Sequence, residues 1–292
     1  MNTRTATQPR EAKQEHVFAS SLRSPDRTAE AITGVSHLSW SRIYCYQRCP
    51  RQFHARYVEH LPPDFRSNSM LFGSGIHAGV ELHHLARLEG LQISREEMLV
   101  AFRQEWSADR NRDVPIRFPN GDNEEKLHEL AARAFGQFLA SPLAKPAGET
   151  IAVEETVIGV IDEDLPTIVA RVDLVTVADD VVRLVDLKTS KASWDPIKAA
   201  ENAGQLALYK LLATTTLAEH GQQIDAEFHV LTRHATPRAE IMPVTLSDTV
   251  VETTLASARS AWDGIQAGAF DPKPNFLCRA CAYRSTCPAF NG

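Results

Sequence analysis

The chain has 292 residues, of which 43% are hydrophobic and 23% are charged. This length and composition are typical of a globular protein that buries a full core, either as one large domain or as one domain with a helical insertion. The formal net charge of −6 excludes a global attraction to nucleic acid. Any nucleic-acid-binding surface would therefore have to be a local basic patch.

The sequence contains no stretch with the apolar length of a membrane span. Its opening segment, MNTRTATQPREAKQEH, lacks the apolar centre of a signal peptide, and nearby acidic residues argue against an organelle transit peptide. We therefore expect a cytoplasmic protein with no membrane partner. In that compartment the five cysteines are better explained as thiols or metal ligands than as disulfides.

The first half of the chain predicts a polar tail followed by helices. Residues 1–34 are polar and lack periodicity, so we expect them to be disordered. Ser39 can cap a helix that continues through apolar positions to Tyr57, before Pro62 and Pro63 end it. Three more helices are predicted at about 73–88, 94–110 and 122–140.

The second half changes to β-branched runs. Residues 149–160, 167–177 and 181–187 are separated by short acidic segments, which predicts three sequential antiparallel strands. A helix at about 197–220, strands at 224–232 and 240–244, and a helix at 247–267 follow. This order favours a mixed α/β core preceded by a helical region.

Two aspartates and a lysine lie within this predicted sheet. Asp173 is in an apolar strand, and Asp186-Leu187-Lys188 ends the next one, so a hairpin can bring the aspartates together. Strand alternation places Asp186 and Lys188 on one face and Leu187 in the core. Two carboxylates and a lysine suit metal-dependent phosphodiester hydrolysis, whereas the alternative is a set of buried ion pairs without catalytic function.

Four segments in this order resemble a known family. They are FGSGIH at 72–77, RVD at 171–173, DLKT at 186–189 and QLALY at 205–209. Together they resemble the RecB-like branch of the PD-(D/E)XK nuclease superfamily, especially its iron–sulfur members, which include CRISPR-associated exonucleases and the nuclease domain of AddB. The likeness covers most of residues 39–290.

The resemblance implies an α/β fold with a restriction-endonuclease-like core, in which helices flank a mixed sheet. A helical insertion and a cysteine-ligated cluster that joins the N- and C-terminal segments would complete it. Residues 35–292 would form a single nuclease domain. Within it, 72–145 would be the helical region, 149–246 the catalytic core and 270–292 the cluster-binding tail.

The resemblance also implies roles for individual residues. The metal, Mg²⁺ or Mn²⁺, would be bound by His77, Asp173, Asp186 and the backbone carbonyl of Leu187. Lys188 would position the attacking water and stabilise charge. Gln205 and Tyr209 share a helix face and would point toward the site. Glu81 and Glu154 are candidates for outer partners of the metal ligands, but we favour a solvated or structural role for both.

The cysteines form a second constellation. Cys278 and Cys281 have the spacing of a tight metal-binding turn, Cys287 follows, and Cys49 is the expected fourth ligand. Cys45 could substitute but is better explained as a packed thiol. Four thiolates bind zinc as readily as a [4Fe–4S] cluster, and spacing alone does not decide between them. The resemblance favours iron–sulfur.

The leading functional prediction is therefore a metal-dependent DNA exonuclease that acts on single-stranded ends or flaps. Repair, recombination, phage replication and CRISPR adaptation all remain open as its pathway. The alternative is a nucleic-acid-binding subunit of a helicase or CRISPR-adaptation complex whose nuclease activity is weak or vestigial. Basic residues near the cysteines would supply the local patch for DNA, namely Arg42, Arg48, Arg51, His54, Arg56, Arg279 and Arg284.

Overall fold

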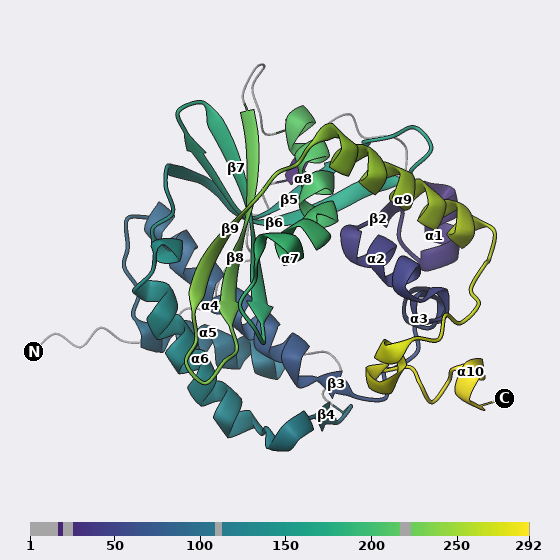
Figure 1. Cartoon of the computed structure of the whole chain (residues 1–292), viewed down its shortest axis with the longest axis horizontal. Coiled ribbons are helices and arrows are strands. Elements are labelled where there is room, and N and C mark those ends of the chain that lie inside the picture. Colours follow the sequence, from purple (N-terminus) through teal and green to yellow (C-terminus); the bar gives the residue numbers. More distant parts are fainter. Residues whose placement is uncertain (1–16, 20–25, 109–112, 217–222, 292) are drawn as a thin grey trace, which may run out of the picture.

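The structure is a computed structural model that describes residues 17–19, 26–108, 113–216 and 223–291. Its centre is a seven-stranded mixed sheet in the order β1-β5-β6-β7-β8-β9, with β2 beside β6 (Figure 1). The strands are β1 (Val17–Ala19), β2 (His37–Leu38), β5 (Glu149–Gly159), β6 (Thr167–Ala178), β7 (Val181–Ser190), β8 (Gln223–Thr232) and β9 (Ala239–Val244). The predicted mixed α/β architecture is thus confirmed.

The strands β5, β6 and β7 form the predicted antiparallel meander, because acidic turns reverse the chain between β-branched runs. Asp179 and Asp180 both have positive φ, at 49° and 61°, in the tight turn between β6 and β7. The next strand, β8, is parallel to β7, with α7 (Pro196–Glu201) and α8 (Ala203–Thr216) in the crossover. The predicted continuous helix over 197–220 is interrupted at Asn202, and residues 217–220 lie outside the described part of the chain.

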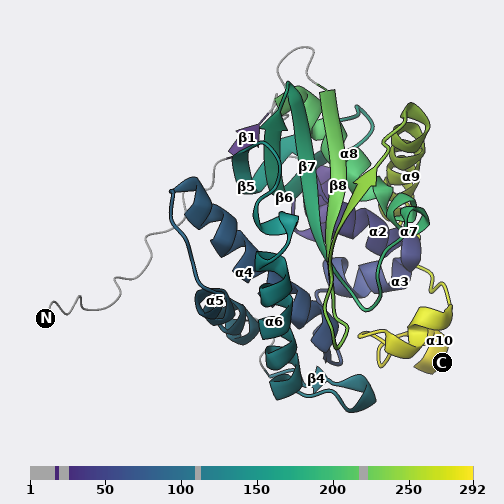
Figure 2. The same cartoon turned by 60° about the vertical axis from the view of Figure 1, so that its left-hand side comes forward.

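Helices cover the two faces of the sheet (Figure 2). One face packs against α8 and α9 (Asp248–Gln266), with apolar side chains such as Leu184, Leu206 and Trp262 in one cluster. On the other side lie α4 (Asn68–Leu88), α5 (Arg95–Ala108) and α6 (Glu124–Leu139), close to their predicted ranges. Leu187 and Leu231 of the sheet join the apolar cluster of these three helices.

The helix α4 owes its close packing to glycines. A Cβ at Gly75 would collide with the ring of Phe102 on α5, and one at Gly79 with the ring of Phe135 on α6. These two glycines therefore allow the neighbouring helices to approach α4 closely. The apolar cluster fixes the face of α4 that meets the sheet, and this fixes the position of His77.

The N-terminal region differs from its prediction in two ways. Residues 1–16 and 20–25 lie outside the described part, but α1 (Arg27–Thr33) is a capped helix, so the expectation of disorder up to residue 34 is wrong there. Asp26 accepts hydrogen bonds from the N–H groups of Thr28 and Ala29, and Gly34 closes the other end at a φ of 72°. The buried Ala29 and Thr33 attach the helix to the core.

The predicted helix from Ser39 to Tyr57 is broken. It consists of α2 (Trp40–Arg48), α3 (Pro50–Phe53) and a π-helical turn, η1 (His54–Val58). Cys49 is extended, with φ −163° and ψ 106°, because the ring of Pro50 disfavours the helical conformation of the residue before it. The break turns Cys49 out of the helix toward the C-terminal segment.

The remaining elements are short. They are β3 (Arg66–Ser67), β4 (Ile116–Arg117), η2 (Pro119–Gly121), η3 (Pro142–Ala144), η4 (Phe276–Ala280) and α10 (Pro288–Asn291). After α9 the chain runs back past α3, so that the yellow C-terminal segment lies beside α3 and reaches toward β3, with α10 at its outer end (Figure 1). No helix in the described ranges is long and apolar enough to cross a membrane.

Candidate active site

The two aspartates lie where β6 and β7 separate. Pairing between these strands ends at Leu174 and Val185, and Asp173 and Asp186 are the next residue on each strand. Beyond this point β7 continues beside β8 only, which leaves its other edge open. The backbone N–H of Leu187 donates a 2.6 Å hydrogen bond to Asp173 Oδ2 and ties the two strands together. The predicted hairpin thus brings Asp173 and Asp186 to one site.

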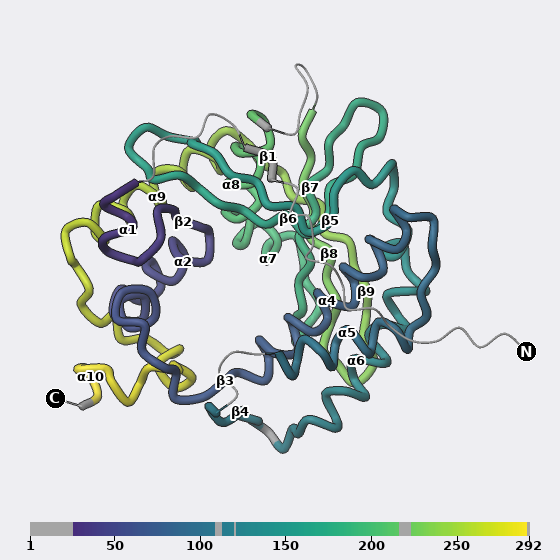
Figure 3. The backbone as a smooth tube through the Cα atoms, turned by 180° about the vertical axis from the view of Figure 1, so that it is seen from behind, coloured from purple at the N-terminus to yellow at the C-terminus, as the bar shows by residue number. Residues whose placement is uncertain are grey.

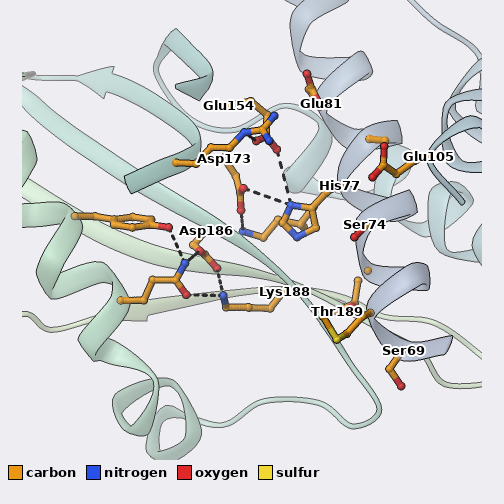
Figure 4. A pocket seen from close by; sticks show the side chains of 17 residues that line it. Ser69, Ser74, His77, Glu81, Glu105, Glu154, Asp173, Asp186, Lys188 and Thr189 are labelled. Carbon is orange, nitrogen blue, oxygen red and sulfur yellow. Dashed lines mark hydrogen bonds and ion pairs between the residues drawn. The ribbon is translucent and has the colours of Figure 1, made fainter. Parts of the chain in front are cut away.

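Lys188 and two residues of α8 hold Asp186. Lys188 Nζ lies 2.7 Å from Asp186 Oδ2 and donates a 2.7 Å hydrogen bond to Gln205 Oε1. Gln205 Nε2 in turn lies 2.6 Å from Asp186 Oδ1 and 2.7 Å from the hydroxyl oxygen of Tyr209 (Figure 4). Asp186 and Lys188 share a face and Leu187 packs into the core, as strand alternation predicts.

His77, from α4, faces the sheet across the same site. Its Nδ1 lies 3.3 Å from Asp173 Oδ1 and 3.8 Å from Glu154 Oε1 (Figure 4). Within the described ranges, His77, Glu154 and Asp173 are the group of three His, Cys, Asp or Glu ligand atoms that lie within 4.8 Å of one another. One imidazole and two carboxylates are a donor set that suits a divalent cation such as Mn²⁺ or Mg²⁺.

Burial and charge perturb the pKa values of all three predicted ligands. Burial raises the pKa of Asp186 to about 6, and the Lys188 ammonium only partly opposes this. Burial also disfavours the charge of Asp173, but the adjacent His77 and the Leu187 N–H hold the pKa of Asp173 below its usual value. For His77, desolvation opposes the charged form, yet Asp173 and Glu154 raise its pKa to about 10. Such opposed shifts are typical of functional sites.

Glu154 lies at the centre of the site, whereas the sequence favoured a solvated or structural role for it. Its side chain is only 10% exposed and forms a 2.6 Å ion pair with Arg171 Nε. Its φ of 53° is the left-handed conformation, which is rare for a non-glycine residue in a strand. Backbone strain of this kind concentrates at functional sites. Nothing in the β-branched pattern of 149–160 reveals it.

These side chains line one cavity with a volume of about 680 Å³. All the predicted site residues of the catalytic constellation contribute to it, namely His77, Asp173, Asp186, Leu187, Lys188, Gln205 and Tyr209. The side chains of Glu81 and Glu105 reach its rim from α4 and α5. The cavity is therefore wide enough for more than a single ion and is lined by both acidic and basic groups.

The cysteines lie in a separate pocket. Cys49, Cys278, Cys281 and Cys287 all line it, together with Tyr283 and Phe290, and none of them forms a disulfide. Cys45 is instead packed in the main apolar core, where burial raises the pKa of its thiol to about 11. The structure thus brings the four predicted ligands into one pocket, and Cys45, although near Cys49 and Cys281, does not line it.

The mixed sheet thus carries one cavity that gathers a candidate metal-binding group, His77, Glu154 and Asp173, beside Asp186 and Lys188. The family profile of the PD-(D/E)XK nuclease superfamily matches residues 37–288, and the chain belongs to this superfamily. A comparison with curated proteins finds no match to the chain.

One solved structure supports the fold. A candidate exonuclease from Eubacterium rectale shares 14% identity and a TM-score of 0.53, with 84% of this chain and 86% of that chain covered. The protein SSO0001 covers 84% of this chain and 95% of its own at 13% identity, but its TM-score of 0.33 carries no argument. At such identities the first likeness supports the fold alone.

Proposed function

We propose that this protein is a metal-dependent deoxyribonuclease of the RecB-like branch that removes nucleotides from single-stranded DNA ends or flaps. The observation that carries this proposal is the position of Asp173 and Asp186 on two separating strands, with Lys188 between Asp186 and Gln205 in the same cavity. Buried ion pairs without a catalytic role do not require a cavity of this size beside them.

His77, Glu154, Asp173 and Asp186 are the residues that would hold Mg²⁺ or Mn²⁺. Glu154 is an addition to the predicted set, because its carboxylate is gathered with His77 and Asp173. The backbone carbonyl of Leu187, which the family resemblance also predicts as a ligand, would be a further donor. When bound, the cation would neutralise charge on the scissile phosphate and lower the pKa of a bound water. The raised pKa of Asp186 and the proximity of two carboxylates fit a site that a cation completes.

The protein's own residues would orient the nucleophile. Lys188 Nζ is fixed by Asp186 and Gln205, so its remaining N–H can point into the cavity toward an attacking water. Its positive charge would offset the negative charge that develops on the phosphoryl oxygens. Tyr209 fixes Gln205, and Gln205 fixes both members of the Asp186–Lys188 pair. The chain Tyr209–Gln205–Lys188 is therefore a positioning device for the water.

Cys49, Cys278, Cys281 and Cys287 would bind a [4Fe–4S] cluster, with zinc as the alternative. Around one tetrahedral zinc, with bonds of about 2.3 Å, sulfur atoms lie about 3.8 Å apart. In the described ranges no three cysteine sulfur atoms lie within 4.8 Å of one another. The thiols thus do not stand at zinc spacing in this structure, and the preference for the cluster rests on the resemblance to iron–sulfur members of the superfamily. Either group would fasten the C-terminal segment to the N-terminal helices.

The test is the digestion of end-labelled single-stranded and duplex DNA by anaerobically purified protein, with Mn²⁺ or Mg²⁺. The comparison variant is Asp186→Asn, and the matched control is Asp179→Asn, which makes the same change at an exposed turn of the same hairpin. We expect metal-dependent release of nucleotides from single strands in the wild type and the control, and none in Asp186→Asn.

Two other outcomes would count against the proposal. Equal cleavage by wild type and Asp186→Asn would place the activity outside this site. An absence of cleavage by folded protein that binds DNA and retains its cysteine-bound group would favour the alternative of a binding subunit with a vestigial nuclease site.

A further inference from the structure

A second large cavity lies between the N-terminal helices and the C-terminal segment. Its volume is about 630 Å³. We call it the basic groove and define it by these lining residues, which come from 48–71 and 280–283: Arg48, Gln52, Arg56, His60, Leu61, Pro63, Phe65, Arg66, Ser67, Met70, Leu71, Ala280, Ala282 and Tyr283. Its lining includes three arginines, one histidine and no carboxylate. In a protein with a net charge of −6, this is a strongly localised positive site.

The groove adjoins the catalytic cavity. Met70, in the first turn of α4, lines both cavities and is 61% exposed. His77 is seven residues further along the same helix, which is two turns and about 10 Å of axial rise. A chain of nucleotides spans that distance easily, so a ligand in the groove could extend to the Asp173–Asp186 site without leaving the surface.

Cationic and apolar side chains share the lining of the groove. Arg48 Nη2 donates to Gln52 Oε1 at 2.8 Å, which holds its guanidinium in place while other N–H groups remain for a ligand. The guanidinium of Arg56 lies 5.0 Å from the ring centroid of Tyr57. Phe65, Met70 and Tyr283 add apolar surfaces to the same lining, and the guanidinium of Arg117 lies over the Phe65 ring, 4.9 Å from its centroid. This pattern fits a single strand, because phosphates pair with arginines while unpaired bases stack on rings.

The C-terminal segment forms one wall of the groove. Asp64 ties it down, because its backbone N–H donates to the Ala282 carbonyl at 2.6 Å and its carboxylate accepts from the Ser285 N–H at 3.0 Å. Arg117 of β4 donates to the Arg279 carbonyl at 3.2 Å. The same segment carries three of the four pocket cysteines, and Figure 3 shows it beside β3 and β4. The wall is thus continuous with the cysteine pocket.

We propose that the basic groove binds the unpaired strand of a nucleic acid and delivers it past Met70 into the catalytic cavity. The occupant is a single strand rather than a duplex, since arginines and aromatic rings line the same cavity and the faces of unpaired bases are free to stack. Arg48 and Arg56 contact its phosphates, and Phe65 contacts a base. The claim that the strand passes into the catalytic cavity rests on the proposed nuclease function. The claim that the groove binds a single strand does not depend on it.

Arg51 shows that not every arginine near the cysteines faces the basic groove. Although it lies between Arg48 and Arg56 in the sequence, its Nη2 pairs with Glu59 at 3.1 Å and its side chain lines the cysteine pocket instead. Arg42 is also absent from the groove lining and stacks over Tyr57, 4.6 Å from the ring centroid. Only part of the basic cluster near the cysteines therefore faces the groove.

The test measures binding of a fluorescent twenty-nucleotide oligothymidylate by anisotropy, in EDTA and over a range of salt concentrations. The groove variant is Arg48→Gln with Arg56→Gln, and the control is Arg95→Gln with Arg133→Gln, which removes equal charge from the exposed faces of α5 and α6. We expect the groove variant to lose about tenfold or more in affinity, and its salt slope to fall by about 1.4 for two lost phosphate contacts. The control should match the wild type.

A second arm tests the kind of ligand. Phe65→Leu should weaken binding of the single strand by about tenfold without a change in salt slope, because it removes stacking but no charge. A blunt duplex should bind more weakly than the single strand and should be insensitive to Phe65→Leu. Equal affinity for duplex and single strand, with equal sensitivity to the groove variant, would overturn the single-strand assignment.

The binding assay contains no metal, so it separates this inference from the proposed function. If the groove variant binds as the control does, the groove is not the binding site, whether or not the protein cleaves DNA. If binding falls but kcat/KM for the same oligonucleotide in Mn²⁺ is unchanged, the groove does not lead to the catalytic cavity. If the wild type binds through the groove but does not cleave, the nuclease proposal fails and the groove assignment stands.

Discussion

The catalytic cavity and the cysteine pocket are built in different ways. The residues of the candidate active site come from long elements, β5, β6, β7, α4 and α8, which strand pairing and the apolar clusters hold in place. Asp186, Lys188, Gln205 and Tyr209 already fix one another by hydrogen bonds and an ion pair. The cysteine pocket is formed by the broken end of α2 and by short turns, and η4 contributes no buried residue.

The cysteine pocket accordingly buries little. Its cysteines are all partly exposed, and Phe276 beside them is 81% exposed. The C-terminal segment is held by a few hydrogen bonds, from residues such as Asp64, Arg51 and Arg117, and the proposed metal or cluster would add to them. The comparison teaches that packing and strand pairing hold the candidate active site in place, whereas the proposed metal or cluster would have to hold the cysteine pocket together. Removing a ligand should therefore cost activity in the first region and structure in the second.

The largest expected effect is a loss of activity in Lys188→Met with the fold intact. Methionine has similar length but no charge. The attacking water therefore loses the group that orients it, and the negative charge on the phosphoryl oxygens loses its positive partner. We expect the single-turnover cleavage rate to fall by about 10²- to 10³-fold, whereas affinity for DNA, measured in Ca²⁺, changes little. Lys198→Met, just outside the cavity on α7, is the control. Retained turnover in Lys188→Met would remove Lys188 from the mechanism.

The next effect is on stability, in Cys281→Ser. We expect loss of the bound iron or zinc, measured by elemental analysis and visible absorbance, and a melting temperature lower by several degrees. A decrease of about 2–4 °C corresponds to about 1 kcal/mol in a domain of this size. The matched control is Cys45→Ala, because Cys45 lies in the core outside the pocket and should leave the metal content unchanged. Equal metal content in both variants would rule out the cysteine pocket as a ligand site.

Much of the catalytic site could be predicted because it depends on local periodicity. The β-branched runs and the acidic turn determine a hairpin, and a two-residue alternation then fixes which side chains meet. The cavity accordingly contains Asp173, Asp186 and Lys188 together. Gln205 and Tyr209 followed from the helical spacing of four, combined with a family resemblance that supplied the role of α8.

Other features depend on contacts that no local pattern encodes. Glu154 enters the site because its backbone is left-handed and because Arg171 and His77 lie across from it. The basic groove requires residues 48–71 to meet residues 280–283, and the sequence gives no measure of that approach. By contrast, α1 did have a local signal, since Asp26 and Gly34 are ordinary capping residues, but the polar composition around it obscured that signal.

A smaller effect is the pH dependence of metal binding. Proximity to Asp173 and Glu154 outweighs desolvation and raises the pKa of His77 to about 10, so a proton competes with the cation at neutral pH. Below that pKa, each metal bound releases one proton, and the affinity for Mn²⁺ should rise by about tenfold per pH unit. Calorimetry between pH 6.5 and 8.5, in buffers of different ionisation enthalpy, measures this release.

The raised pKa of His77 also makes the stability of the metal-free protein depend on pH. Because the pKa of His77 is higher in the folded state than in the unfolded chain, its contribution to stability is complete below pH 6.5 and declines as the pH rises toward 10. In His77→Asn the metal affinity should be weaker and its pH dependence flatter. A wild-type affinity that does not change with pH would show that His77 is not a metal ligand.

The smallest expected effect is that of Tyr209→Phe. Its hydroxyl oxygen lies 2.7 Å from Gln205 Nε2, two contacts away from Lys188, and the ring remains in the core without it. The loss of one hydrogen bond of this kind corresponds to about two- to tenfold in rate. We expect kcat to fall by that factor with KM unchanged, because the interaction orients Lys188 rather than DNA. A fall in affinity instead of kcat would make Tyr209 a substrate contact, and the positioning chain would then end at Gln205.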